Sequence, residues 1–468
     1  MRETSVEQWA VVEFGRAALG DIRRGRRLVL IAAGAAKRPS GKVSAVFERA
    51  CDREGAYDFL ESAHVSASSV AESVFRATVE RAQKECGAYV YVPVDGSSLA
   101  LTDERGEKGF GGVGATDVGA RGLKVISALA VGTDGVPLGL IGQHFWAREP
   151  KKRATSWEVT KRPFAEKEIF FFAQVAKDAL ERLAAANRRA WVIIDREGDS
   201  RDILRSLSDS GCTFTVRARG DRKIAVRDEM ATIREALSKQ KRLGTHDVEV
   251  PRNGSRAARV AKVELRAAKI QLRLRARDDD ATSTLPFDVQ VVWACESKAR
   301  AGIEPLDWLL LTNHNVQTPS DALAVLDSYR ARWRVEEFHR TWKTGSCNVE
   351  DAQLRSVEAV VKWATVLAAV AARIERLKYF ARKKPELPAT KELQPLEIEA
   401  LLLERRRRGE HHAKAPSIEL ATKWIAELGG WMGPSSGPPG SITLARGLER
   451  LAYYVDALEF VRSTGRST

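Results

Sequence analysis

Two short apolar runs, each followed by an aspartate, constrain the fold of this chain more than any other feature. The run from Ala88 to Val94 reads AYVYVPV and leads to Asp95, and the run from Ala190 to Ile194 reads AWVII and leads to Asp195. Continuous apolar runs of this length are typical of strands that are buried on both faces of a sheet. Both acids are therefore expected where a buried strand ends.

The segments between these runs predict the architecture. Apolar runs from Leu123 and Pro137 indicate two more strands, and residues 161–187 have the Ala, Phe and Leu periodicity of a helix. The order strand, strand, strand, helix, strand predicts an α/β sheet with acids at strand ends, which is where sites in such sheets gather.

The stretch YRARWRVEEFHRTWK, residues 329–343, contains no Pro or Gly and predicts one helix. At about 100° per residue, the side chains within or near one arc of about 60° are Tyr329, Arg332, Glu336, Arg340 and Lys343. The opposite side, where a core is expected, consists of Ala331, Val335, Phe338 and Trp342. Glu336 is therefore an acid among cations. It is either half of a surface ion pair or a metal ligand on a helix that binds phosphates.

Composition limits the class of protein. The 468 residues allow two to four domains, or one large domain with insertions, and the net charge of +14 favours a polyanionic partner. The five cysteines are scattered and never spaced as CxxC, which argues for reduced thiols in a cytosol and against a zinc knuckle. The N-terminus has acids where a signal peptide needs an apolar core. The most apolar helical run, Val360 to Ile374, contains Lys362 and is too short to span a bilayer, so it predicts a buried helix.

Residues 1 to about 70 predict a helical module with basic helix ends. Gly20 and Asp21 indicate a turn and an N-cap before an apolar helix. The basic residues at the two ends of that helix are Arg23, Arg24, Arg26, Arg27, Lys37, Arg38 and Lys42. They form either a solvated helix surface or the phosphate contacts of a DNA-binding module, and the local sequence favours neither.

The pattern changes between about residues 218 and 305. Segments such as RVAKVELRA and KIQLRLRA alternate with period two, which predicts a β insertion of antiparallel strands with one buried and one basic face. The acidic run Asp278 to Asp280 is interpreted as a turn, because no further metal ligands lie at spaced positions.

Beyond the insertion, DWLLLTN from Asp307 predicts another buried strand, and the chain after residue 374 is helical and basic. His411 and His412 are interpreted as surface residues of a charged loop. The tail from Ile442 is an apolar-periodic helix and a candidate for contact with a partner.

Three acids form the candidate catalytic group: Asp95 and Asp195 at strand ends and Glu336 on a helix. Three carboxylates at one sheet edge would repel one another unless cations bind between them. Two divalent ions about 3.5–4 Å apart can run in-line phosphoryl transfer, and carboxylate oxygens suit Mg²⁺ or Mn²⁺. The cations beside Glu336 would then hold phosphates.

The residues Tyr329, Arg332, Glu336 and Lys343 together meet the pattern Y-x2-R-x3-E-x6-K. This pattern resembles the signature of bacterial cut-and-paste DDE transposases, and the chain is most similar to the transposon-five type of that family. The resemblance extends over almost the whole chain, in the segments ALGDIRRGRRL, EGAYDFL, DGSSL, DRE, TVR, WLLLT and EEFHRTWKTG.

The resemblance implies an α/β fold with a ribonuclease-H-like catalytic core, an antiparallel β insertion, and helical N- and C-terminal domains. The implied boundaries are 1–70 for a DNA-end-binding domain, 71–217 and 306–374 for the core, 218–305 for the insertion, and 375–468 for a dimerisation domain. The implied partners are double-stranded DNA, both transposon ends and target, and a second copy of the chain. The implied setting is the cytoplasm of a bacterium, in association with the nucleoid.

The resemblance also implies roles for single residues. Asp95, Asp195 and Glu336 would hold Mg²⁺, two ions per site, with Mn²⁺ as a substitute. The residues that would contact DNA are Tyr329, Arg332, Lys343, Arg340, Arg217, Trp308, Arg23, Arg24, Arg27 and Lys37. Among them, Trp308 would receive a base flipped from the transposon end during a hairpin step.

Two other functions stay open at this level. The chain could be a catalytically silent DNA-binding regulator or domesticated copy, although all three acids are present. It could also be a structure-selective nuclease of the same fold, which would cut branched DNA without recognising an end sequence.

Overall fold

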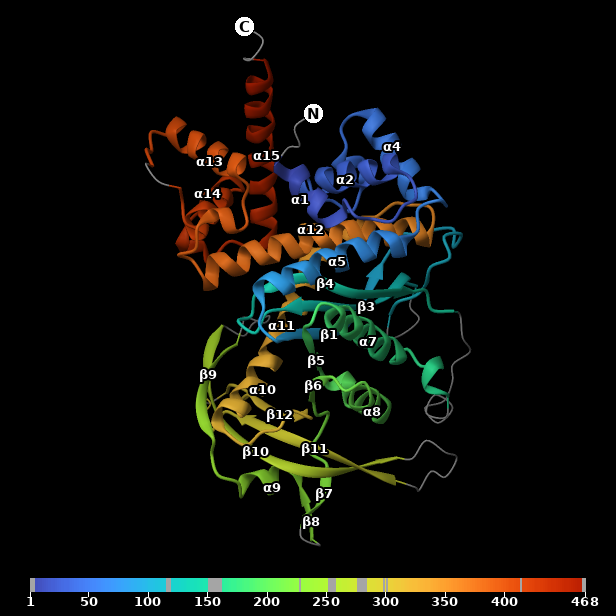
Figure 1. Cartoon of the computed structure of the whole chain (residues 1–468), viewed down its shortest axis with the longest axis vertical. Helices are drawn as coiled ribbons and strands as arrows, with labels where there is room; N and C mark the ends of the chain where they lie inside the picture. Colours follow the sequence, from blue (N-terminus) through green and yellow to red (C-terminus); the bar gives the residue numbers. More distant parts are fainter. Residues whose placement is uncertain are drawn as a thin grey trace. The chain divides into compact units, whose positions relative to one another are not determined.

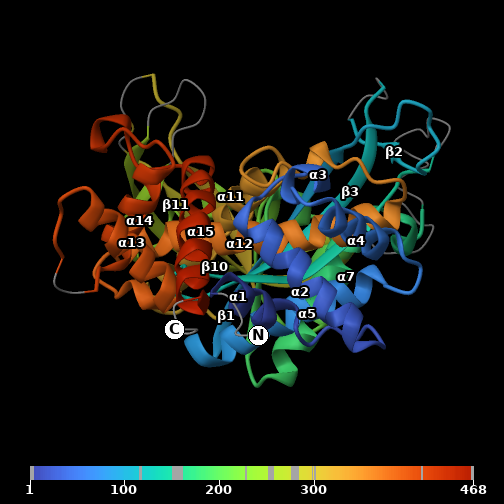
Figure 2. The ribbon, with the colours of Figure 1, turned by 90° about the horizontal axis from the view of Figure 1, so that it is seen from above.

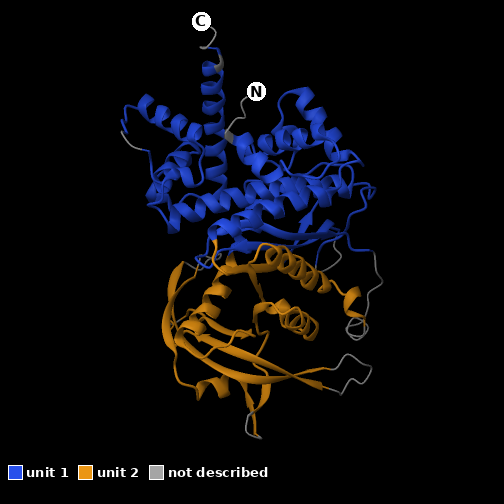
Figure 3. Cartoon of the chain, viewed as in Figure 1, with its two compact units in different colours: residues 1–85, 96–153, 334–468 blue, residues 86–95, 154–333 orange. Residues whose placement is uncertain are grey.

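A computed structural model describes residues 5–114, 119–149, 162–226, 229–250, 258–275, 284–297, 299, 302–412 and 415–464. The chain forms two compact units (Figure 3). Unit 1 consists of residues 1–85, 96–153 and 334–468, and unit 2 of residues 86–95 and 154–333. The fold is mixed α/β, with strands of both directions flanked by helices.

Unit 1 is mainly helical. Its helices are α1 (Ser5–Phe14), α2 (Ile22–Lys37), α3 (Val43–Val46), α4 (Ala50–Glu61), α5 (Ala67–Glu85), α11 (Trp333–Lys343, from Arg334 on), α12 (Val357–Lys383), α13 (Pro395–Arg407), α14 (Ile418–Leu428) and α15 (Ser441–Thr464). Short 3₁₀ turns are η3 (Val349–Asp351), η4 (Ala389–Lys391) and η5 (Pro434–Ser436). Its strands are β2 (Gly111–Gly112), β3 (Arg121–Val131) and β4 (Pro137–Trp146), paired antiparallel on either side of β3.

Helix α12 is the centre of unit 1. Ser356 caps its start by accepting a hydrogen bond from the backbone N–H of Ala359 at 3.2 Å. Helices α2, α4, α5 and α14 and strand β4 pack around it (Figures 1 and 2). Because the run from Val360 to Ile374 is apolar on every side, the helix is buried on every side, which confirms the sequence prediction.

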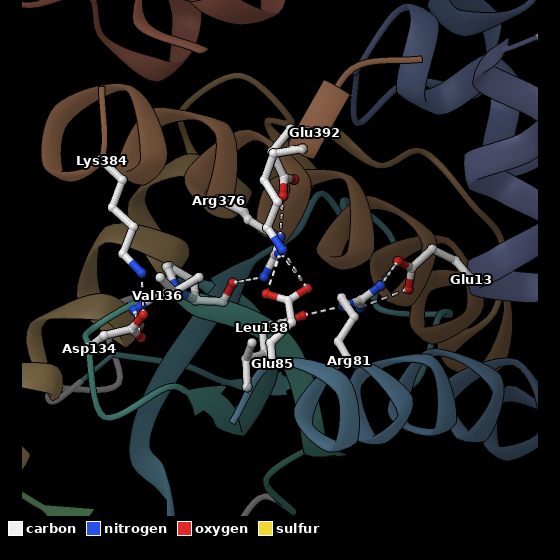
Figure 4. Close-up of polar contacts among 11 residues, drawn as sticks. Glu13, Arg81, Glu85, Asp134, Val136, Leu138, Arg376, Lys384 and Glu392 are labelled. Atoms are coloured by element: carbon white, nitrogen blue, oxygen red, sulfur yellow. Dashed lines mark hydrogen bonds and ion pairs between the residues drawn. The ribbon is translucent and has the colours of Figure 1, made fainter. Parts of the chain in front are cut away.

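The start of strand β4 is held by side chains from two helices (Figure 4). Arg81 of α5 donates to the carbonyl of Leu138 at 2.6 Å, and Arg376 of α12 donates to that of Pro137 at 3.0 Å. Arg376 also bonds Glu85 and Glu392, each at 2.8 Å. Burial raises the pKa of Glu392, and Arg376 opposes that rise. Among the described strands, β4 pairs only with β3. Arg81 and Arg376 therefore donate hydrogen bonds to β4 carbonyls that have no neighbouring strand to bond with.

Unit 2 is built on a sheet. Strand β1 (Tyr89–Ala100) contributes residues 89–95, and its remaining residues belong to unit 1. The strand order is β1, β5 (Arg189–Ile194), β6 (Thr213–Arg217), β12 (Asp307–Thr312), β11 (Thr284–Cys295), β10 (Arg259–Arg275) and β9 (Gly244–Val250). The first three strands are parallel and the later pairs are antiparallel.

Helices cover this sheet. α7 (Phe170–Ala185) packs on β5, α8 (Arg201–Asp209) on β6, and α10 (Pro319–Ala331) on β5, β6 and β12 (Figure 1). The remaining elements are η1 (Phe164–Glu166), η2 (Arg196–Gly198), α9 (Ile233–Ser238) and the hairpin of β7 (Lys223–Val226) with β8 (Glu229–Thr232).

Strand β10 has the alternation that the sequence predicts, with one change along its length. In its first half the odd-numbered Ala261, Val263 and Leu265 are buried, whereas in its second half the even-numbered residues from Ile270 to Leu274 are buried. The pairing with β11 continues through this change without a shift. The two halves of one strand therefore bury opposite faces. The exposed basic residues alternate with the buried ones and are Lys262, Lys269, Arg273 and Arg275.

The predicted strands beginning at residues 88, 123, 137, 190 and 307 are confirmed as β1, β3, β4, β5 and β12. The predicted end of the first strand at Asp95 is wrong, because β1 continues through Asp95 to Ala100. The predicted helix over 161–187 is shorter, since its described part is η1 followed by α7. The acidic run Asp278 to Asp280 lies outside the described residues.

The prediction of one helix over residues 329–343 is wrong. Helix α10 ends at Ala331 and α11 begins at Trp333, with Arg332 between them. The N–H of Arg332 bonds the carbonyl of Tyr329 at 3.1 Å, three residues back, so the last turn of α10 tightens instead of continuing. The predicted core side is nevertheless correct, because Val335, Phe338 and Trp342 are fully enclosed.

In the part of the chain that the structure describes, no helix is long and apolar enough to cross a membrane.

Glu404 on α13 gives a pH-dependent prediction. Hydrogen bonds from Arg407 and then Arg408 lower the pKa of Glu404 from 4.5 to about 2. A carboxyl whose pKa is lower in the folded state stabilises the fold above its unfolded pKa and loses that effect as the pH falls through the folded pKa. Glu404→Gln should therefore reduce the free energy of unfolding at pH 7, and the difference from wild type should shrink between about pH 4.5 and about pH 2.

Urea unfolding at several pH values measures this difference. Glu419→Gln is the control, because Glu419 is an exposed partner of Lys423 on α14. An equal loss of stability at pH 7 in both variants would contradict the role given to Glu404.

Candidate active site

Asp95 and Asp195 lie side by side at one edge of the unit 2 sheet. Strands β1 and β5 run parallel with Tyr89 opposite Arg189 and Pro93 opposite Ile193. The same register, continued by two residues, puts Asp95 opposite Asp195 on strands that lie about 4.8 Å apart. Both side chains are half-buried. Asp195 directly follows the end of β5, as predicted, whereas Asp95 lies within β1 two residues beyond its last pair with β5.

The backbone after Asp195 turns sharply and fixes that side chain. Asp195 is the N-cap of η2, and its Oδ1 accepts a hydrogen bond from the N–H of Glu197 at 2.8 Å. One carboxylate oxygen is thus engaged with the backbone, which orients the group at the sheet edge.

Two further predicted residues reach the same edge. In the register of β5 with β6, Ile194 lies opposite Val216, so Arg217 follows next to Asp195. Strand β12 runs the other way and begins at this edge, which brings in Trp308. This edge therefore combines acids, a cation and an indole.

Trp308 packs on the C-terminal end of α10. Its ring meets that of Tyr329 edge to face, with centroids 5.0 Å apart, and the guanidinium of Arg332 lies 5.7 Å from the centroid of the Tyr329 ring. Tyr329 is only 4% exposed, whereas Trp308 and Arg332 are half-buried. The tyrosine is thus a support for the tryptophan more than a surface group.

Asp199 is a site residue that the sequence did not reveal. Its carboxylate accepts hydrogen bonds from the N–H of Arg219 at 2.6 Å and from the side chain of Arg222 at 2.5 Å. It thereby ties the turn after Asp195 to the loop after Arg217. The only signal in the sequence is the short run DREGDS, in which Ser200 also caps α8.

Glu336 belongs to unit 1 and is half-buried in the first turn of α11. Helix α11 is fixed to α12, since the indole N–H of Trp342 donates to the carbonyl of Ala364 at 2.9 Å and the hydroxyl of Thr341 donates to Glu375. Glu337, which the sequence places away from the cationic arc, pairs with Arg334. α11 therefore presents Glu336 from a rigid base.

The basic residues that follow Glu336 differ in their surroundings. Lys343 lies 3.6 Å from Glu350, which itself accepts a hydrogen bond from the N–H of Ala100 at 2.9 Å. Arg340 is exposed.

Metal binding was predicted for all three acids. Within the described residues, no group of three or more His, Cys, Asp or Glu side chains is close enough to hold a metal ion. Asp95 and Asp195 together offer hard oxygen donors on adjacent strands, which suit a divalent cation such as Mg²⁺. Their like charges also favour a cation between them. The pair fits such an ion, and the three-acid site stays a prediction.

The predicted N-terminal DNA contacts are placed unevenly. Arg23 is exposed beside Asp21, the confirmed N-cap, whereas Arg24 donates to the carbonyl of Leu19 at 3.1 Å. Arg27 lies against Gly55 of α4. Lys37 pairs with Asp456 of α15 at 2.6 Å. Of these four residues, Arg23 is the most exposed.

Arg26 shares the outer side of α2 with Arg23. Both are exposed, as are the apolar residues Ile22 and Leu30, which lie about one turn before and one turn after Arg26. Helical spacing does not identify Arg26 as exposed, because apolar residues four positions before and after it, Ile22 and Leu30, ordinarily indicate a buried face.

Comparison with known families agrees with this arrangement. Residues 6–65 match the transposase DNA-binding family, and residues 173–372 match the transposase DDE domain. The first match covers α1–α4, and the second includes Asp195, Arg217, Trp308 and Glu336. The DDE domain implies a ribonuclease-H-like fold and chemistry with divalent metal ions, and the DNA-binding domain supports DNA as the partner.

The aspartate pair leads to a binding prediction. Asp195→Asn keeps the oxygen that accepts from Glu197 but removes the charge, so Mg²⁺ or Mn²⁺ affinity should fall by at least about tenfold while the fold is retained. Isothermal titration of the ion into the protein measures this affinity. Asp209→Asn, an exposed change on α8, should leave it unaltered; equal affinities in all three proteins would contradict the assignment of Asp195.

Proposed function

We propose that this chain, which carries the DNA-binding and DDE domains of a DDE transposase, is an active DNA transposase. It binds the terminal repeats of its element, cleaves both strands by metal-dependent phosphoryl transfer through a hairpin, and joins the 3′ ends to target DNA. It acts as a homodimer that pairs two ends.

The observation that carries this proposal is the register of β1 with β5. Continued by two residues, this register supports a position of Asp95 beside Asp195, with Arg217 on the next strand. Two adjacent carboxylates with a cation beside them suit a site that binds a divalent ion and a phosphate together. Glu336, on a helix fixed to α12, is the third acid of the proposed group.

In the proposed reaction, Asp95, Asp195 and Glu336 would hold two Mg²⁺ ions. Such ions activate the attacking water or 3′-hydroxyl and stabilise the leaving oxygen. Arg217, Arg332, Arg340 and Lys343 hold phosphates near the cleaved end as charge-assisted hydrogen-bond donors. The exposed Arg23 and Arg26 of α2 contact the DNA backbone farther from the cut, and this contact makes binding depend on salt.

Trp308 and Tyr329 act as a pair in this proposal. A half-buried indole supported edge to face by a buried ring offers a rigid surface for a base that leaves the stack. Tyr329 contributes mainly through that support.

A cleavage assay tests the proposal. The substrate is a duplex that carries the inverted repeats flanking the gene, with Mg²⁺ present. Wild type should nick at the element end and later yield strand-transfer product, whereas Asp195→Ala should lower nicking by at least about 10³-fold. Asp209→Ala on α8 is the matched control and should cut like wild type.

The other functions give different results in the same assay. If wild type and Asp195→Ala both fail to nick, the chain is a silent DNA-binding protein and the enzyme proposal fails. Cutting of branched DNA without the repeats, and without strand-transfer product, would indicate a structure-selective nuclease.

Trp308 gives a separate prediction. Trp308→Ala should leave first-strand nicking within about twofold of wild type but lower hairpin formation by at least about tenfold, because base stacking on an aromatic ring is worth about 1–3 kcal/mol. Trp308→Phe keeps a ring against Tyr329 and should retain most of the hairpin product. Denaturing gels that separate nicked from hairpin DNA measure both steps, and equal loss of both in Trp308→Ala would indicate a folding role instead.

A further inference from the structure

The first turns of α12 hold the DNA-binding domain through the ends of its neighbouring helices. Glu61, the last residue of α4, accepts hydrogen bonds from the N–H of Arg355 at 2.9 Å and the hydroxyl of Ser356 at 3.1 Å. In return Glu358, in the first turn of α12, accepts from the N–H of Ala67, the first residue of α5, at 2.7 Å. Each helix start thus receives a carboxylate from another helix, and Glu358 satisfies the first N–H of α5, which has no partner within its own helix.

Lys362 adds a positively charged contact to the same junction between α4 and α12. Its ammonium donates to the carbonyls of Leu60 at 3.0 Å and Ser62 at 2.9 Å, at the end of α4. The side chain is only 1% exposed. Burial lowers the pKa of Lys362, and the nearby Glu358 and Glu61 oppose that shift. A cation at the carbonyl end of a helix is the favourable complement to the helix dipole.

The next two residues of α12, Trp363 and Ala364, connect this turn to the segment before α3 and to helix α11. The indole N–H of Trp363 donates to the carbonyl of Gly41, before α3, at 2.7 Å. The carbonyl of Ala364 accepts the indole N–H of Trp342 on α11 at 2.9 Å. Gly41 is tightly fixed as well, because a Cβ there would lie 2.1 Å from the carbonyl oxygen of Asn348.

One turn of α12, residues 362–364, therefore contacts both the domain that matches a DNA-binding family and the helix that carries Glu336. None of these contacts depends on long exposed side chains. The distance between the two elements is consequently fixed by packing inside unit 1.

We propose that Lys362 is a positioning residue that sets which phosphate of the bound DNA end meets Glu336. The lysine is buried against the carbonyls of Leu60 and Ser62, so it would act through the protein. It holds the end of α4 on α12, and through α12 it keeps the DNA-binding domain in register with Glu336. The inference rests on the proposed transposase function and adds to it a determinant of cleavage position.

Cleavage mapped at single-nucleotide resolution tests this inference in the full chain. The probe is the end-labelled duplex with the inverted repeats that flank the gene, with Mg²⁺. Lys362→Met keeps a long apolar stem and removes the ammonium. We expect end binding within about threefold of wild type, nicking slower by about 100-fold, and cuts spread over neighbouring phosphates, since a shift of about 1 Å at a reacting centre has an effect of this size.

A second pair of variants keeps the test decisive if Lys362→Met folds poorly. Glu358→Gln still offers an oxygen to the N–H of Ala67 and should cut at the wild-type phosphate, whereas Glu358→Ala should scatter the cuts. Lys423→Met, which removes an exposed lysine of α14, is the matched control for loss of charge.

The outcomes separate the two proposals. If wild type nicks while Lys362→Met and Glu358→Ala both cut at the wild-type phosphate, the positioning role is overturned and the transposase function stands. If the variants lose rate but keep a single cut position, Lys362 has only a folding role and the inference is again overturned. If wild type does not nick, both proposals fail.

Discussion

The burial of α12 is the constraint on which the rest of unit 1 depends. A helix surrounded on all sides satisfies its own backbone, but every polar side chain on it must find a partner inside the protein. Lys362 and Arg376 do so by different means: the lysine takes the carbonyls at the end of α4, and the arginine takes two carboxylates and a strand carbonyl. Because each partner belongs to another element, satisfying α12 also fixes those elements. The polar groups of this helix thus specify where its neighbours sit, while apolar contact supplies most of the stability.

In unit 2, backbone strand pairing rather than buried polar side chains determines where the candidate site residues lie. Parallel strands point their carboxyl ends toward the same edge of a sheet, so residues that follow apolar runs can be brought together without any attraction between them. The register of β1 with β5, continued by two residues, directs Asp95 and Asp195 to the same edge although two carboxylates do not attract each other. Asp199 then joins the two loops of that edge through Arg219 and Arg222. Backbone pairing sets the position of the acids, and side-chain bonds set the shape of the loops around them.

The elements that sequence predicted well were those with a strong local cause. Strands β1 and β5 follow from apolar runs, the buried α12 follows from apolarity on every side, and the cap at Asp21 follows from its residue type. The predictions that failed had either no local sequence signal or partners far along the chain. The break at Arg332 leaves no mark in a stretch without Pro or Gly, and the role of Asp199 depends on a loop some twenty residues later. Lys37 was expected to face DNA, yet its partner Asp456 lies at the other end of the chain.

The change of buried face within β10 limits how this strand can vary. With continuous pairing to β11, a slip of one residue would turn Ile270, Leu272 and Leu274 outward and bring charged neighbours such as Arg273 inward. The same slip would turn Ala261, Val263 and Leu265 of the first half outward, so a shift by one residue would expose the buried residues of both halves. A deletion on either side of the changeover near Ala267 would likewise leave one half in the wrong phase. Strand β10 should therefore tolerate substitutions of its exposed side chains but not insertions or deletions within the strand.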